Sequence, residues 1–173
     1  MEINPVDFLV CFILFNLLLK VGYPLSGFLH ELGHGFTGLL LTRKSKVRIY
    51  FGRCGENPTL RFGRLCFHIG PTTHFHGTCE IDADLPPRHV LLIAAAGPLI
   101  SCALAIVSLQ ALFNASFPWG FRLIAGVLFY ANCRLFISSA APRMLDHPHV
   151  SGKSSPSDGL RILEILKPKG ERD

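Results

Sequence analysis

Charged residues are scarce in this chain. Asp, Glu, Lys and Arg together make up 17% of its 173 residues, whereas 49% are hydrophobic. The mean hydropathy of +0.38 is too high for an ordinary soluble domain, so the composition favours a membrane protein. The sequence also lacks internal repeats and an appended soluble domain, and we expect a single membrane-embedded domain over residues 1–173.

Paired cysteines are also missing, because none of the six cysteines belongs to a Cys-x-x-Cys motif. Cys54, Cys66 and Cys79 lie in a segment that the charge pattern below places in the cytosol, so no disulfide framework is expected. The other three are expected to be small core hydrophobes within the spans: Cys11, Cys102 and Cys133.

Three stretches are long and apolar enough to cross a membrane, at about residues 6–41, 90–113 and 119–140. As one helix, the first would be about 54 Å long, which exceeds a hydrocarbon core of about 30 Å. Pro24 therefore predicts a bend or a division into two pieces. A cleaved signal peptide is the competing interpretation, but no basic residue precedes Val6 and the apolar stretch continues without a break.

Basic residues are absent before Lys20 and from the turn at residues 114–118. They gather instead between the first two spans and in the segment 142–173. By the positive-inside rule, we expect an N-terminus outside and a cytosolic C-terminus in a multi-pass protein of the lipid bilayer. The net charge of +5 then reflects topology, and no nucleic-acid partner is expected.

The helical pattern is lost over residues 42–88. Residues 46–51, 60–62 and 64–69 alternate polar and apolar side chains between glycines and prolines, which predicts short antiparallel strands; a further strand is expected over 74–81. An open edge of this sheet would accept an extended peptide by strand addition. A closed sheet that only caps the spans is equally compatible with the sequence. Residues 142–156 are expected to form a loop, followed by a short amphipathic helix over 160–166.

The motif His30-Glu31-Leu32-Gly33-His34 lies in the first apolar stretch. On a helix the two histidines share a face and can bind one metal ion, with Glu31 beside a water bound to that ion. Zn²⁺ lowers the pKa of such a water, and the carboxylate of Glu31 can then take its proton. The competing interpretation is two buried histidines that stabilise a helix contact.

A catalytic zinc site usually has three protein ligands, so a third must come from elsewhere in the chain. We favour Asp158, which opens the last helix on the same side of the membrane, because the following Gly159 lets the backbone turn close to the metal. By their chemistry, five other residues are rivals: His74, His76, Asp146, His147 and His149.

The chain resembles the site-2 protease family of intramembrane zinc metalloproteases over nearly its whole length. The matching pieces are His30 to Gly35, Ala96-Gly97-Pro98-Leu99 and Ser157-Asp158-Gly159, in the family's order. The resemblance implies that His30, His34 and Asp158 bind zinc and that Glu31 is the general base. The chain departs from the family at Ser101 and at residues 139–142, where the family often has Asn. The family's PDZ and nucleotide-sensing domains have no counterpart in the sequence.

The expected fold class is therefore an α-helical integral membrane protein with a three-span metalloprotease core and a strand-rich insertion between the first two spans. The expected function is zinc-dependent endopeptidase cleavage of a transmembrane protein substrate, with a zinc-bound water activated by Glu31 as nucleophile. Regulation would come from a membrane partner or from a first cut elsewhere in the substrate. The alternative is a pseudoprotease that binds zinc and partner membrane proteins, although metal binding alone does not require Glu31. A soluble zincin conflicts with the three spans.

Overall fold

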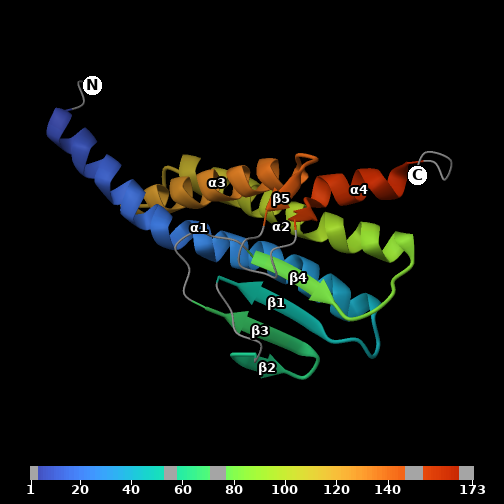
Figure 1. Cartoon of the computed structure of the whole chain (residues 1–173). Helices are drawn as coiled ribbons and strands as arrows, with labels where there is room; N and C mark the ends of the chain where they lie inside the picture. Colours follow the sequence, from blue (N-terminus) through green and yellow to red (C-terminus); the bar gives the residue numbers. More distant parts are fainter. Residues whose placement is uncertain (1–3, 53–57, 71–76, 147–153, 168–173) are drawn as a thin grey trace.

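The computed structural model describes residues 4–52, 58–70, 77–146 and 154–167, and it is mostly helical (Figure 1). Three long helices dominate: α1 (Pro5–Leu41), α2 (Pro87–Phe113) and α3 (Trp119–Ala140). All three are long and apolar enough to cross a membrane. A small sheet follows α1. The predicted arrangement of three candidate spans with a strand-rich insertion after the first is thereby confirmed.

The helix boundaries follow from local capping. Asn4 caps α1 by accepting a hydrogen bond from the backbone N–H of Val6, and α1 then continues through Pro24 as one element. Of the two alternatives predicted for Pro24, a bend or a division into two pieces, the division does not occur. α2 begins at Pro87, slightly earlier than the expected residue 90, because a proline is well suited to the first turn of a helix, where its missing N–H has no partner to lose.

Four strands form the sheet, in the spatial order β2-β3-β1-β4. Their bounds are β1 (Val47–Phe51), β2 (Leu60–Phe62), β3 (Leu65–Ile69) and β4 (Gly77–Ile81). The expectation of purely antiparallel strands is wrong, because β1 and β3 pair in parallel. β2 is fully exposed and takes the outer edge, whereas β3 is buried over four of its five residues and takes the place beside β1. Burial of the more apolar strand therefore decides the order.

The segment expected to be a loop after α3 contains a second, two-stranded sheet. β5 (Met144–Asp146) pairs antiparallel with β6 (Ser154–Pro156), and α4 (Asp158–Leu166) follows directly. Ser157 joins these parts: its hydroxyl donates to the carbonyl of Ala141 and accepts from the N–H groups of Arg143 and Leu160. This buried serine therefore fixes the start of α4 against the end of α3.

The C-terminal part of α1 carries the sheet. Val47, Ile49, Leu65 and Phe67 form a buried cluster. The approach is close because α1 presents glycines: a Cβ at Gly38 would lie 2.5 Å from the side chain of Ile81.

Arg64, from the turn between β2 and β3, further fastens the sheet to the end of α1. Its guanidinium donates to the carbonyls of Leu39, Thr42 and Ser45. Carbonyls at the end of a helix lack partners within the helix, so this contact satisfies them.

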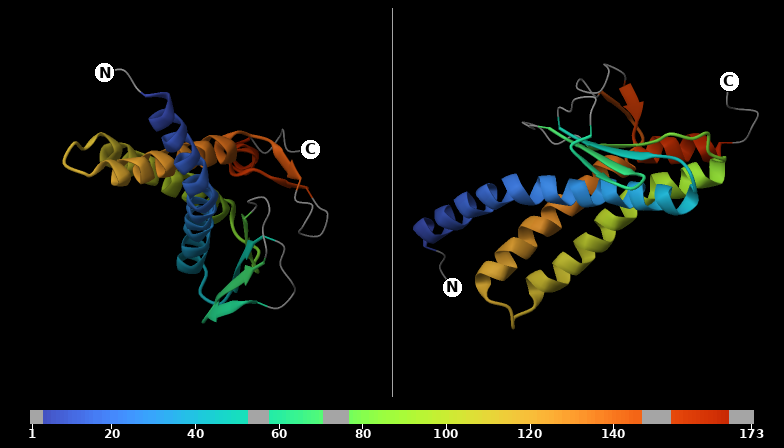
Figure 2. Two further views of the ribbon diagram at one scale, coloured as in Figure 1. Left: turned by 90° about the vertical axis from the view of Figure 1, so that its left-hand side faces the viewer. Right: turned by 90° about the horizontal axis from the view of Figure 1, so that it is seen from below.

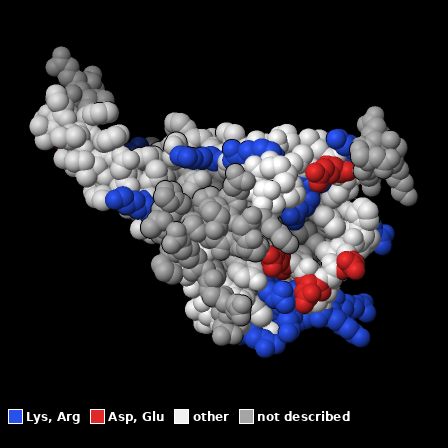
Figure 3. Space-filling model, in the orientation of Figure 1, with Lys and Arg blue, Asp and Glu red and all other residues white. Residues whose placement is uncertain are grey.

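The N-terminal part of α1 extends away from the other helices. Figure 2 shows α1 diverging from the α2–α3 hairpin toward the N-terminus, and on the face shown in Figure 3 the N-terminal end of α1 carries no charged side chain. Cys11 lies there and is exposed, so its expected place in the core is wrong. Its surroundings are exposed apolar side chains such as Phe8 and Phe12, which suit contact with lipid.

Candidate metal centre

Two histidines one turn apart on α1 point into the molecule. His30 and His34 are 5% and 6% exposed, and their Nε2 atoms lie 3.2 Å apart. The rings meet edge to face with centroids 4.9 Å apart. A helix places positions i and i+4 on one face, so the sequence spacing alone brings the two nitrogens together.

Asp158 is brought to the histidines by tertiary structure. Its Oδ2 atom lies 3.2 Å from Nε2 of His30 and 3.3 Å from Nε2 of His34. Burial opposes ionisation of Asp158, but hydrogen bonds and charge interactions with the two histidines outweigh it and hold the pKa of the carboxyl below its usual range. The three ligand atoms are close enough to hold one metal ion between them.

The histidines are oriented from behind by α2. Nδ1 of His34 donates to the carbonyl of Ile93 over 2.6 Å, and Nδ1 of His30 is hydrogen bonded to the fully buried hydroxyl of Ser101 over 2.9 Å. Such contacts fix the tautomer of a metal-binding histidine and leave Nε2 for the ion. Ser101 thus serves as a partner of His30.

Two glycines allow this packing. A Cβ at Gly97 on α2 would overlap Nε2 of His34 and lie 2.7 Å from Nε2 of His30. A Cβ at Gly159 would overlap the carbonyl of Ala140 at the end of α3. The expectation that Gly159 serves a turn at the metal is thus corrected: Gly159 lies within α4 and makes room for α3.

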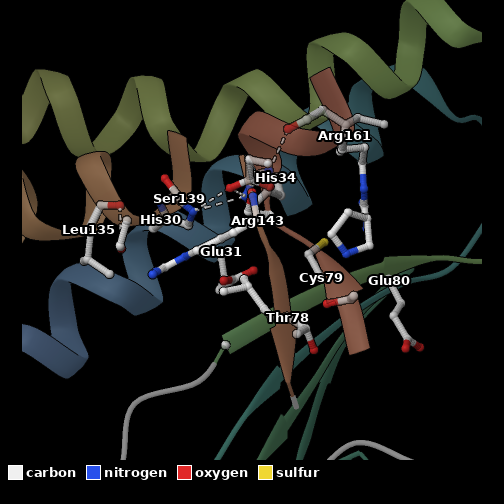
Figure 4. Close-up of a pocket in the computed structure, with 18 of the residues that line it drawn as sticks. His30, Glu31, His34, Thr78, Cys79, Glu80, Leu135, Ser139, Arg143 and Arg161 are labelled. Atoms are coloured by element: carbon white, nitrogen blue, oxygen red, sulfur yellow. Dashed lines mark hydrogen bonds and ion pairs between the residues drawn. The ribbon is translucent and has the colours of Figure 1, made fainter. Parts of the chain in front are cut away.

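Glu31 lies between the histidines and the sheet. The side chain is 7% exposed, and a Cβ at Gly77 of β4 would come within 2.6 Å of its Cγ. In Figure 4, Glu31 points toward β4 and not into the helical bundle. Thr78, the next residue of β4, has a buried hydroxyl without a hydrogen-bond partner in the described part of the chain. Glu31 therefore lies on the side of the three ligand atoms that faces β4.

Cys79, also on β4, offers sulfur close to this centre. Burial and the neighbouring charge of Glu31 raise the pKa of its thiol. Its sulfur is not among the three ligand atoms that converge in the described part of the chain.

A cavity of about 520 Å³ opens in front of these groups (Figure 4). Its volume lies within the range of small-ligand sites. The wall combines α1, the edge strand β4, the end of α3, the β5–β6 sheet and the first turn of α4. β4 pairs only with β1 among the described strands, so one of its edges is open, and its residues 77–80 line the cavity.

The predicted site residues thus meet in one place: Glu31, His30, His34 and Asp158 all line the cavity. Of the rivals, Asp146 belongs to β5 and its side chain is not described, while His74, His76, His147 and His149 lie outside the described residues. Three further arginines line the cavity: Arg143 and Arg161 were interpreted from sequence only as topological charges, and Arg134 was not singled out. Their position in the cavity had no sequence signal, because α3, β5–β6 and α4 converge only in the fold.

No protein-family model, no curated protein and no solved structure matches the chain. The resemblance to site-2 proteases therefore rests on the motif residues and on their order in the sequence.

Proposed function

We propose that the protein is a zinc-dependent endopeptidase that cleaves membrane-embedded or membrane-proximal segments of other proteins. The observation that carries this proposal is the placement of Glu31 beside three convergent ligand atoms at the wall of a cavity. A Glu within an apolar helix is costly unless it has a task, and two histidines with an aspartate do not need it in order to bind a metal.

The ligand geometry supports zinc. Two ligand atoms bound about 2.0–2.1 Å from a tetrahedral zinc ion lie about 3.3 Å apart. The separations among His30, His34 and Asp158 are 3.2, 3.2 and 3.3 Å, a nearly equilateral triangle. Nitrogen and carboxylate ligands from three residues also suit a catalytic zinc site that keeps a fourth position open.

In the proposed reaction, the residues of the chain divide the work. Bound zinc would lower the pKa of water toward neutrality and polarise the scissile carbonyl. Glu31 takes the proton from the attacking water as the new C–O bond forms, and it returns that proton to the amine as the C–N bond breaks. The open edge of β4 holds the substrate backbone by strand addition, with the hydroxyl of Thr78 as an additional donor.

A comparison of Glu31→Gln with the wild type tests the proposal. Glutamine keeps the size of the side chain but cannot accept a proton, so the variant should bind zinc normally and lose cleavage of co-expressed single-span substrates. Proton transfer alone supplies a rate increase of about 10²–10⁴-fold, and we expect the cleavage rate to fall by more than this factor. Glu164→Gln, an exposed position on α4, is the matched control.

Three results would contradict the proposal in different ways. Cleavage by Glu31→Gln at the wild-type rate would exclude Glu31 as the general base. Binding of substrates without cleavage by either protein would favour a pseudoprotease. If the purified protein binds no zinc, the assignment of a zinc site is itself rejected.

A further inference from the structure

Three arginines of the cavity wall have no carboxylate partner among the described residues. Arg134, Arg143 and Arg161 form no ion pair with any Asp or Glu in the part of the chain that the structure describes. Arg134 belongs to α3, one of the three candidate spans, where a positive charge is costly and is kept mainly for a function. The positive-inside rule explains basic loops, but it does not explain an arginine inside a span that faces a cavity.

Arg134 packs on Tyr23 of α1. Its guanidinium lies over the tyrosine ring, 5.7 Å from the ring centroid, and Arg143 lines the same cavity. Tyr23 also lines the cavity and precedes His30 by seven residues, which is two helical turns and about 10.5 Å. That distance corresponds to about three residues of an extended peptide.

The third arginine lies on the other side of the centre. Arg161 follows Asp158 by one turn of α4 and interacts electrostatically with Glu31 and Cys79 (Figure 4). The remaining acidic residue of the cavity wall is Glu80, which pairs in register with Arg48 and points away from the histidines in Figure 4. Asp158 is held by the histidines, and no carboxylate of the cavity wall forms an ion pair with the three arginines in the described part of the chain.

We propose that the cavity selects substrate segments that carry an acidic side chain, bound by Arg134 and Arg143 about three residues from the scissile bond. This inference deepens the proposed function and rests on it, because it takes the cavity to be the place where the substrate backbone lies. Arg161 favours a second acidic residue closer to the bond. Arginine and carboxylate form paired, charge-assisted hydrogen bonds with a fixed geometry. A lysine or an apolar residue at the same substrate position leaves the guanidinium groups unpaired.

Peptide binding to the zinc-loaded Glu31→Gln protein tests this selectivity without requiring cleavage. The probes are fluorescent 12-residue peptides of Ala, Leu and Thr that carry one Glu, Gln or Lys at successive positions. We expect the Glu peptide to bind at least about tenfold more tightly than the Gln peptide at one preferred position, which is about 1.4 kcal/mol or more. The preference should be lost in Arg143→Gln, restored in Arg143→Lys and unchanged in the matched control Arg61→Gln, an exposed residue of β2.

Four outcomes separate this inference from its rivals. Equal binding of Glu and Gln peptides overturns it, even if the wild type cleaves both, in which case the proposed function stands alone. A preference that persists when both Arg134 and Arg143 are replaced by Gln is not carried by these arginines and also overturns it. Binding of short-chain phosphatidylserine that depends on Arg143, together with no preference for the Glu peptide, makes the arginines a lipid-headgroup site and also overturns it. A clear preference together with wild-type protein that cleaves nothing upholds the arginine site and rejects the protease.

Discussion

The two parts of α1 differ in what they bury. Before Gly22, large apolar side chains face outward, with Phe8 at 63% and Val21 at 70% exposure. From Gly22 onward, the helix buries residues that are all small or polar. These buried residues are Gly22, Ser26, Gly27, His30, Glu31, Gly33, His34, Gly35 and Gly38.

This contrast follows from the solvent that we expect around the helix. Lipid tails are as apolar as leucine, so moving a leucine from lipid into protein gains little. Helices then associate through small residues that allow close packing, and polar groups gather where the protein surrounds them. Gly33 shows the effect, because a Cβ there would lie 3.0 Å from the carbonyl oxygen of Ala96 on α2. The half of α1 before Gly22 thus suits contact with lipid, and the other half holds the candidate metal centre.

The largest expected effect, on bound zinc, comes from removing Asp158, the ligand that α4 adds to the two histidines of α1. Asp158→Ala should lose nearly all bound zinc, because only the two nitrogens remain. Glu164→Ala, on the same helix but exposed, should keep a full equivalent. Metal analysis of purified protein measures both. A full equivalent of zinc in Asp158→Ala would return the third-ligand assignment to Asp146 or the undescribed histidines.

The next largest effect is expected from filling the space that Gly97 of α2 leaves for the histidines of α1. Gly97→Ala should displace both histidines, since the added methyl overlaps Nε2 of His34. Overpacking of this kind costs about 1–3 kcal/mol, and we expect zinc affinity to fall more than the about 10–100-fold typical of outer contacts. Gly126→Ala on α3 is the control, because its Cβ would lie an ordinary 3.6 Å from Leu112. Equal zinc affinity in the two variants would argue against the packing.

A smaller effect is expected from the hydroxyl that orients His30. Ser101→Ala removes the hydrogen bond to Nδ1 without disturbing the ligand atoms, so zinc affinity should fall about 10–100-fold. Ser101→Thr should retain most of the affinity if its added methyl fits. Competition titration with a fluorescent chelator resolves this range. An unchanged affinity in Ser101→Ala would show that packing alone holds the ring.

The smallest effect is expected in the part of α1 that faces outward. Phe12→Ala, at a residue that is 57% exposed, should change stability by no more than about 0.5 kcal/mol and leave zinc affinity unaltered. Thermal unfolding in nanodiscs and metal analysis are the measurements. A loss of zinc in this variant would mean that the two parts of α1 are not independent, and the contrast between them would not hold.

Much of the fold was predictable from local patterns. The three apolar stretches correspond to α1, α2 and α3 because length and hydropathy are properties of contiguous residues. His30 and His34 meet for a similar reason, since helical periodicity alone sets their spacing. The position of β3 between β1 and β2 was missed, because strand order depends on which edge buries the most apolar surface. The β5–β6 sheet was missed because its residues carry loop-like composition.

By itself, the sequence determined three apolar helices and two histidines and a glutamate on the first of them, because these depend on residues adjacent in the chain or one turn apart. Only the tertiary structure decided that Asp158 reaches the histidines while Ser101 and Ile93 support them from behind. It also decided that the arginines of α3, α4 and the segment between them share one cavity. These contacts join residues as many as 128 positions apart. Only helix packing through Gly97 and Gly159, together with the hydrogen bonds of Ser157, brings such residues together.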